Sequence, residues 1–184
     1  MKKTINLWPV PVALKDVSES GLHVKLEAPA AVRAALAPLG ALRELTQLTA
    51  VFDVTRRGAG LRVLGRVKGR VGQACVVTLE PIENDIDEEV DLLFSPDAPV
   101  VPEGGDPAHH RSFGHTPDEG DLPEPLIGGT IDLGAIAVEF LMLGVDPYPR
   151  KPGVEFAAPA RDSEAERPFA ALAALKKPSG DGGP

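Results

Sequence analysis

An alternation of polar and apolar residues with a period of two runs through much of residues 48–94 and constrains the fold more than any other feature. Such alternation is typical of β-strands that bury one side and expose the other. Glycine and proline mark the breaks between the alternating runs. We therefore expect an antiparallel meander of three strands and two turns, with strands at about residues 48–56, 61–79 and 82–94 and turns at 57–60 and 80–81.

The first hairpin of this meander has a register that gathers apolar residues on one face. Antiparallel pairing of Arg56 with Leu61 aligns the inward positions of the two strands, and the ring of Phe52 then covers a glycine. The inward pairs expected are Leu48 with Gly69, Ala50 with Val67, Phe52 with Gly65, and Val54 with Val63.

The second hairpin follows from pairing Leu79 with Ile82 across the turn. One of its inward pairs is polar, so we expect a β-bulge or an uncovered patch at that pair. The inward pairs expected are Cys75 with Ile86, Val71 with Val90, and the polar pair Gln73 with Glu88.

Charge is segregated along the chain. Residues 43–70 contain seven basic and two acidic residues, whereas residues 80–97 contain eight acidic residues and no basic one. These charges fall on the outward face of the expected sheet. A solvated face with cross-strand ion pairs is the simpler interpretation. The alternative is a surface that binds RNA or a protein partner, with candidate residues Arg56, Arg57, Arg62, Arg66 and Lys68.

Within that surface, the expected register makes two arginines the strongest candidates. Arg70 faces Asp91 directly, whereas Arg62 and Arg66 lie beyond the stretch that the acidic strand covers. Their charges are therefore expected to remain available to a partner.

Two helices are expected to flank the meander. A strand at 21–27 is followed by Pro29 and an alanine-rich helix that runs to about Ala37. A second, strongly apolar helix begins after Asp132, its expected N-cap, and ends before Pro147. The fold class expected is α+β: an antiparallel β-meander sheet packed by a C-terminal helix and a short N-terminal helix, with a long mobile loop.

One domain of residues 1–153 is expected from the chain length of 184 residues. Residues 95–129, rich in Pro, Gly and acidic residues, are expected to be a disordered loop within it. Residues 154–184 are expected to be a flexible tail with a short amphipathic helix near 169–177. That helix fits either docking onto its own domain or binding in the groove of a partner.

Composition excludes several classes of function. Aromatic residues make up only 4% of the chain, which disfavours RNA binding by base stacking. The net charge of −8 argues against nonspecific binding to nucleic acid. With a single cysteine, Cys75, and no apolar run of signal-peptide or membrane-spanning length, the sequence indicates a cytoplasmic protein.

The sequence shows no pattern of a known catalytic centre: it has no phosphate-binding loop and no Ser-His-Asp order. Cys75 is expected to face the core, where the pKa of a thiol rises and its reactivity falls. We expect no enzyme activity, no cofactor and no metal, although one cluster has the composition to bind a divalent ion weakly. Its residues, with a spacing that matches no closed site, are Asp106, His109, His110, His115 and Asp118.

Four segments together have a distinctive spacing: Trp8-Pro9-Val10, the turn Cys75–Pro81, the strand end Phe94-Ser95-Pro96, and Asp132–Arg150. They resemble the YceD family, a bacterial and plastid group associated with accumulation of large-subunit ribosomal RNA. The form Cys-Val-Val-Thr-Leu-Glu-Pro is similar to an alphaproteobacterial-type branch. Thr78 stands where many relatives have a second cysteine, so a thiol pair or a zinc site has no support here.

This resemblance implies a non-catalytic ribosome-biogenesis factor that supports accumulation or processing of large-subunit ribosomal RNA. The family's frequent gene neighbourhood with a large-subunit ribosomal protein implies the same role. From the charge segregation we hypothesise that the partner is an rRNA precursor or a ribosomal protein, and the sequence indicates no membrane and no small-molecule substrate. In that hypothesis Arg62, Arg66 and Lys68 contact phosphate, and the acidic strand or loop contacts basic protein.

Two alternatives to that interpretation stay open. The first is an acidic module that shields a basic ribosomal protein without contacting RNA. The second is a thiol enzyme that uses Cys75. The direct partner, the oligomeric state and any ordering of the 95–129 loop on binding do not follow from the sequence.

Overall fold

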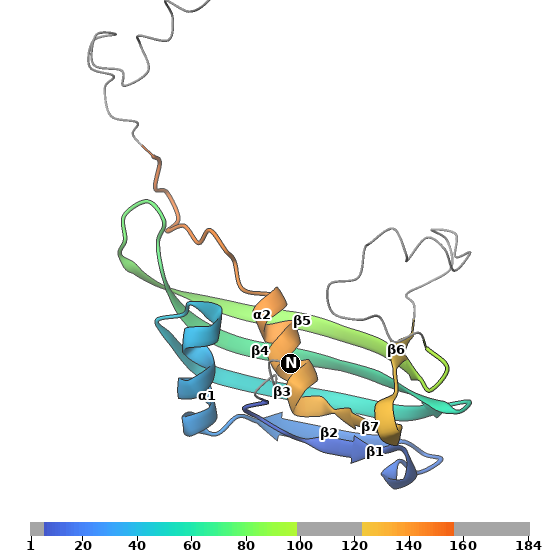
Figure 1. Cartoon of the computed structure of the whole chain (residues 1–184). Coiled ribbons are helices and arrows are strands. Elements are labelled where there is room, and N and C mark those ends of the chain that lie inside the picture. Colours follow the sequence, from blue (N-terminus) through green and yellow to red (C-terminus); the bar gives the residue numbers. More distant parts are fainter. Residues whose placement is uncertain (1–5, 99–122, 157–184) are drawn as a thin grey trace, which may run out of the picture. The chain divides into compact units, whose positions relative to one another are not determined.

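The computed structural model describes residues 6–98 and 123–156 of the chain (Figure 1). Residues up to Pro152 form one compact unit, and the chain from Gly153 belongs to a second. The first unit has the predicted α+β class. With 3₁₀-helices written η, its elements are β1 (Pro11–Ala13), η1 (Leu14–Asp16), β2 (Leu22–Glu27), α1 (Ala30–Leu36), η2 (Ala37–Gly40), β3 (Glu44–Arg57), β4 (Gly60–Ala74), β5 (Pro81–Ser95), β6 (Glu124–Pro125), η4 (Ile127–Gly129), β7 (Thr130–Asp132) and α2 (Leu133–Leu143).

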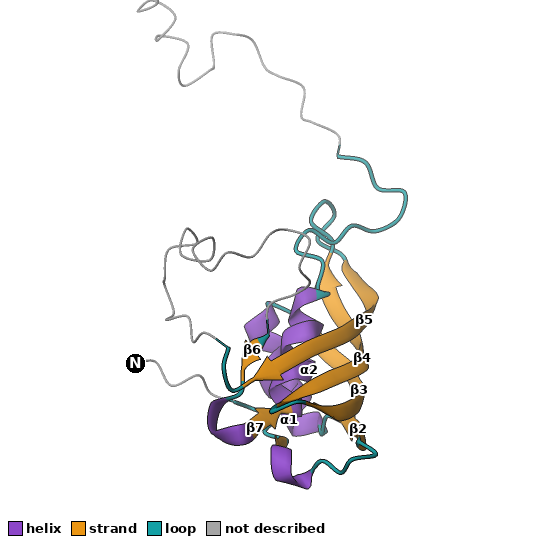
Figure 2. Ribbon diagram, turned by 90° about the vertical axis from the view of Figure 1, so that its right-hand side faces the viewer, coloured by secondary structure: helices purple, strands orange, loops and turns teal. Residues whose placement is uncertain are grey.

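Five strands form one sheet in the order β2-β3-β4-β5-β6. The pairs from β2 to β5 are antiparallel, whereas β6 joins β5 in parallel at Phe94 and Ser95. Figure 2 shows both α-helices on the same side of this sheet, which leaves its other side open to solvent. A separate two-stranded sheet of β1 and β7, which the sequence did not predict, ties the N-terminal segment to the start of α2.

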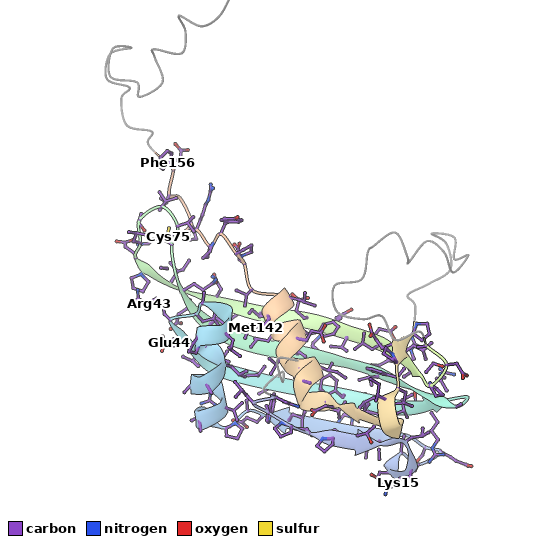
Figure 3. All side chains as sticks on the ribbon, in the orientation of Figure 1. Lys15, Arg43, Glu44, Cys75, Met142 and Phe156 are labelled. Carbon is purple, nitrogen blue, oxygen red and sulfur yellow. The ribbon has the colours of Figure 1, made fainter. Side chains whose placement is uncertain are left out.

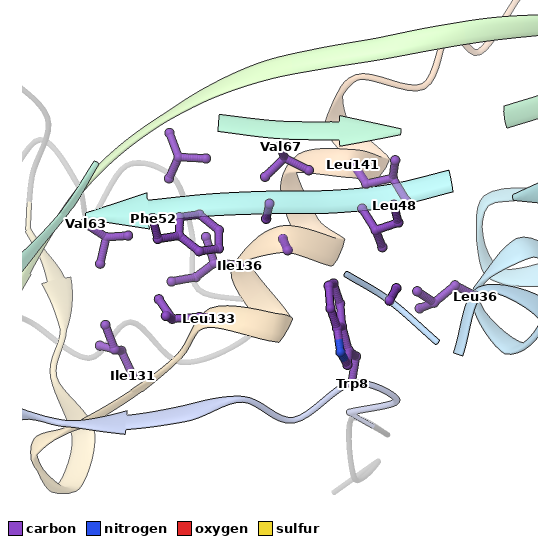
Figure 4. Packing of buried hydrophobic residues seen from close by; sticks show 14 of the residues in the cluster. Trp8, Leu36, Leu48, Phe52, Val63, Val67, Ile131, Leu133, Ile136 and Leu141 are labelled. Carbon is purple, nitrogen blue, oxygen red and sulfur yellow. The ribbon is translucent and has the colours of Figure 1, made fainter. Parts of the chain in front are cut away.

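The core lies between α2 and the covered face of the sheet, as predicted. Phe52 and Val67 from the sheet and Leu133 and Leu141 from α2 have no exposed surface, and Figure 4 shows them in one apolar layer. Trp8 is also buried in this cluster, so its side chain anchors the N-terminal segment to the core. Apolar area removed from water in this layer is therefore the main source of stability.

Helix α2 begins at its predicted N-cap. The carboxylate of Asp132 accepts hydrogen bonds from the backbone N–H groups of Gly134 and Ala135, at 3.0 and 3.1 Å. These two donors would otherwise lack a partner in the first turn of the helix. The same carboxylate accepts from the N–H of Val10 at 2.9 Å, so it also fixes the N-terminal segment against the helix.

The predicted register of the first hairpin is confirmed. Leu48 pairs with Gly69, Phe52 pairs with Gly65, and the other expected pairs also form. The only irregularity between these two strands is a bulge at Leu45 and Gln47.

The predicted register of the second hairpin is wrong by six residues. Ile86 pairs with Gly69 instead of Cys75. Strand β4 already ends at Ala74, and residues 75–80 form a loop in place of a tight turn. In this loop Leu79 has a φ of 61°, a left-handed conformation that no strand contains. Because six is an even number, the shift leaves the same side chains on the covered face.

This shift also removes the predicted polar mismatch and the bulge expected with it. Gln73 pairs with Ile82 and not with Glu88. Its buried amide donates to the carbonyl of Asp146 at 2.8 Å and accepts from the side chain of Asn84 at 2.7 Å. The polar residue is therefore satisfied inside the core.

The predicted loop 95–129 is too long at both ends. Ala98 is buried, Leu126 is buried, and β6 and η4 lie between Glu124 and Gly129. Pairing with β5 explains this order, since Leu126 also donates its N–H to the carbonyl of Ser95 at 2.9 Å. Residues 99–122, the helix predicted near 169–177 and most of the predicted tail lie outside the described residues, so these interpretations stay predictions.

Candidate partner-binding surface

The open side of the sheet carries a row of ion pairs between β4 and β5, which we call the ion-pair ladder. At one end, the guanidinium of Arg62 donates two hydrogen bonds to the carboxylate of Asp91, at 2.9 and 2.7 Å. At the other end, Arg70 donates to Asp85 at 2.7 Å. The ladder consists of Arg62, Arg66, Lys68 and Arg70 from β4 and of Asp85, Asp87, Glu89 and Asp91 from β5.

The middle of the ladder is a shared network. Arg66 contacts both Glu89 and Asp87, the latter at 3.4 Å, and Lys68 contacts Asp87 at 3.3 Å. Hydrogen bonds between the partners shift their pKa values in opposite directions. The bond to Asp91 raises the pKa of Arg62, and the same bond lowers the pKa of the Asp91 carboxyl group. Arg62 and Asp91 are therefore both charged at neutral pH.

The expectation that Arg62 and Arg66 lie beyond the acidic strand is wrong. The six-residue shift moves β5 along β4 until its carboxylates lie beside both arginines. An arginine already bonded to a carboxylate binds a phosphate less strongly, because the phosphate must displace the carboxylate.

The other two candidate arginines lie in different surroundings. Arg56 donates to the carbonyl of Val17 at 2.7 Å and to that of Leu14 at 2.9 Å, so it holds the N-terminal segment. Arg57 lies at the end of β3 and forms no hydrogen bond or ion pair within the described residues. It lines a shallow hollow of about 360 Å³ together with Arg62, Asp91 and Leu93. The structure thus gathers all candidate residues except Arg56 on the open face.

The far edge of β5 adjoins the ladder. On that edge, β6 pairs only with Phe94 and Ser95. Residues 81–93 of β5 have no other strand beside them within the described part of the chain. Figure 1 shows β5 as the last long strand of the sheet, with β6 touching only one end.

A groove of about 470 Å³ lies on the covered side of that edge, between α2, the end of β5 and residues 124–132 of β6, η4 and β7. Its apolar lining includes Leu92 and Phe94 of β5 and Phe140 and Leu143 of α2. Leu143 is 71% exposed. Acidic groups stand at its margin, among them Glu124 and Glu139. Sequence reasoning missed this groove, although the apolar composition of α2, where Glu139 is the only charged residue, was a signal.

Cys75 lies in the loop between β4 and β5, as Figure 3 shows, and not on a strand as predicted. It is fully buried, as expected. Its pKa, however, is lowered to about 6 instead of raised, because the Thr78 hydroxyl and the backbone N–H of Lys151 donate to the sulfur. The thiol is therefore readily ionised, but its burial leaves no path by which a substrate could reach the sulfur.

The segment after α2 fixes this loop from outside. The N–H of Val76 donates to the carbonyl of Pro149 at 2.9 Å, and the ammonium of Lys151 binds the carboxylate of Glu80 at 2.9 Å. Residues distant in sequence thus determine where the second hairpin turns.

A family model described as large ribosomal RNA subunit accumulation protein YceD matches residues 63–176. The chain belongs to the YceD family. The matched range includes most of β4, all of β5 and α2, and hence the groove, Cys75 and every ladder residue except Arg62. Searches of curated proteins and of solved structures gave no match. The more specific resemblance to an alphaproteobacterial-type branch stays a prediction.

Membership in the YceD family implies a role in accumulation of large-subunit ribosomal RNA, and the family is described as an accumulation factor and not as an enzyme. In the parts of the chain that the structure describes, no helix is long and apolar enough to cross a membrane. The histidine and aspartate cluster of residues 106–118 lies outside the described residues.

Proposed function

We propose that this YceD-family protein is a non-catalytic factor in the accumulation of large-subunit ribosomal RNA, and that it acts by binding a basic ribosomal protein along β5. The observation that carries this proposal is the ion-pair ladder. Each basic residue of β4 in the ladder has a carboxylate of β5 as its partner. The cations of the ladder are therefore already paired, and the open side of β5 carries one further acid, Glu83, outside the ladder.

Two further features support a basic partner in preference to RNA. The carboxylates of β5 have cations on their β4 side only, within the described residues, so their other side attracts positive charge. The whole chain has a net charge of −8, which repels a phosphate backbone.

The non-catalytic part of the proposal rests on Cys75. It is the only cysteine of the chain, and it is completely buried. A thiolate without access to solvent does not attack a substrate, whatever its pKa.

A second candidate, direct contact with rRNA, is favoured by the hollow beside Arg57. This arginine has no ion-pair partner within the described residues and lies next to Arg62. A phosphate placed there would lie beside Arg62, whose guanidinium becomes available if its ion pair with Asp91 opens.

A charge variant separates the two candidates. In the full-length protein, Asp87→Asn with Glu89→Gln removes two carboxylates and frees Arg66 and Lys68. We expect weaker binding to purified basic large-subunit ribosomal proteins and stronger binding to rRNA fragments, measured by titration at low salt. The matched control is Glu19→Gln with Glu27→Gln, which removes the same charge from exposed positions without ion pairs among the described residues.

Depletion of the protein tests the functional assignment itself. We expect large-subunit RNA to fall relative to small-subunit RNA, and unchanged accumulation would contradict the proposal. Binding to rRNA alone, with none to the basic proteins, would favour the second candidate.

A further inference from the structure

Strand β5 is a long edge strand that carries acidic side chains. Native sheets blunt long open edges with charge, short length or a cover, because unpaired backbone N–H and C=O groups bind other strands. Strand β5 is 15 residues long, and within the described residues only Phe94 and Ser95 have a partner on the far side. The pairing with β6 shows that this edge accepts a strand.

The side chains on the open side of β5 favour an added strand that carries positive charge. Five of the outward residues of β5 are exposed acids: Glu83, Asp85, Asp87, Glu89 and Asp91. A second copy of β5 laid against this row would bring like charges together, which destabilises cross-strand pairing. A strand with basic residues at the matching positions would be attracted, as β4 is on the other side.

The side chains on the covered side of β5 favour an added strand with apolar residues on that side. Val90 and Leu92 point toward the covered side, and the groove beside Leu92 continues to Phe140 and Leu143 on α2. A strand added to the edge directs alternate side chains to each face of the sheet. Its covered-side residues next to Leu92 therefore enter the groove, and apolar residues fit there.

We infer that residues 81–93 of β5 bind an extended segment of a partner protein as an added strand, and that this segment alternates basic and apolar residues. The inference rests on the proposed function and names the binding mode of the same surface. Main-chain hydrogen bonds supply affinity in this mode, and the alternating side chains supply specificity.

Two synthetic peptides test the alternation. The first is a ten-residue peptide of alternating lysine and valine, and the second has the same composition with its lysines in one block. With the full-length protein at low salt, we expect the alternating peptide to bind about tenfold more tightly, because only it satisfies both faces. N-methylation of every second amide, which removes backbone donors, should cost about tenfold again.

Hydrogen exchange locates the bound peptide. Backbone amides within residues 81–93 should exchange more slowly when the alternating peptide is present, and amides of β2 at the opposite edge should not change. Protection at β2 instead of β5, or no protection at either edge, would overturn the inference.

A matched pair of surface leucines tests the groove. Leu143 lines the groove and is 71% exposed, whereas Leu39 lies outside it and is 67% exposed. We expect Leu143→Ser to weaken peptide binding by about three- to tenfold. Leu39→Ser should leave the affinity unchanged, and both proteins should remain folded because the side chains are exposed.

The outcomes distinguish the inference from the proposed function. If purified basic ribosomal proteins bind but the two peptides bind equally, strand addition is wrong and the proposed function stands. If neither the proteins nor the peptides bind, both are wrong. Preferential binding of the alternating peptide, with protection in β5 and sensitivity to Leu143→Ser, supports the inference.

Discussion

Cys75 combines two properties that point in opposite chemical directions. Its pKa of about 6 makes it largely thiolate at neutral pH, whereas its complete burial keeps reagents away. We expect iodoacetamide to alkylate Cys75 in the folded protein at pH 7.5 at least about 100-fold more slowly than in urea, because reaction requires local opening. Mass spectrometry of samples taken over time measures this ratio. Equal rates in both conditions would support the alternative hypothesis of a thiol enzyme.

Asp132 is a single residue that joins three parts of the chain. Its carboxylate accepts from two N–H groups of the α2 N-terminus, from the N–H of Val10, and from the side chain of Asn6 at 2.6 Å. We expect Asp132→Ala to lower the free energy of unfolding by about 2 kcal/mol, the upper end for an N-cap, because the Val10 donor also loses its partner.

Urea denaturation measures the effect of Asp132→Ala. Asp132→Asn, which keeps one acceptor oxygen, serves as the control and should lose less. A loss below about 0.5 kcal/mol for the alanine variant would show that water replaces the carboxylate.

At the scale of secondary structure elements, the sequence predicted the faces well and one register badly. Periodicity is a local property, so the alternation identified β3, β4 and β5 and placed Phe52 over Gly65. The turn of the second hairpin depends on bonds from Pro149 and Lys151, more than 70 residues away in sequence. No local pattern carries that information, and the Glu80-Pro81 pair resembled a tight turn.

For the candidate site, too, the sequence predicted the strand faces and failed to predict the register. The sequence correctly placed the charges of β4 and β5 on one face, because that depends only on the phase of each strand. It did not predict which carboxylate faces Arg62, because that depends on the register. It also gave no sign of Arg56 binding the Leu14 and Val17 carbonyls, a contact made by an irregular segment.

Helix α2 stabilises the sheet through one row of its side chains. Leu141 has no exposed surface and lies over Gly69, where any added Cβ would collide with it. We expect Leu141→Ala to lower the free energy of unfolding by about 3 kcal/mol, since it removes a buried side chain and leaves a cavity. Leu143→Ala, two residues later and 71% exposed, should change it by less than about 0.5 kcal/mol in the same urea titration. Equal losses would contradict the assignment of the buried face.

At the scale of the whole molecule, one side of the sheet supplies stability and the other supplies charge. Helices α1 and α2 cover the first side, and the ion-pair ladder lies on the second. Exposed ion pairs contribute little to stability individually. The ladder therefore serves mainly to set the charge pattern that a partner meets, and this separation lets charge variants test binding without unfolding the core.

The carboxyl groups of the ladder predict how the stability of the molecule responds to acid. Hydrogen bonds from Arg70 and Arg62 hold the pKa values of Asp85 and Asp91 below their ordinary value of 3.8. A carboxyl group with a lowered pKa in the folded state stabilises that state above its ordinary pKa, and the contribution disappears as the pH falls through the folded value. We therefore expect the contribution of the ladder to the free energy of unfolding to change little between about pH 7 and 5 and to fall below about pH 4. Protonation of the Cys75 thiolate, whose pKa is about 6, should separately lower the free energy of unfolding as the pH falls from neutral to about 5.

A pair of variants assigns part of this acid sensitivity to the ladder. Asp85→Asn with Asp91→Asn removes the two shifted carboxyl groups, so this variant should lose less stability between pH 5 and 3 than the wild-type protein does. Glu19→Gln with Glu27→Gln removes two carboxyl groups without ion pairs among the described residues and should lose as much as the wild type. If both variants follow the wild-type curve, the ladder contributes nothing to stability. Partner binding would then be the remaining explanation for the regular row of ion pairs across the sheet face.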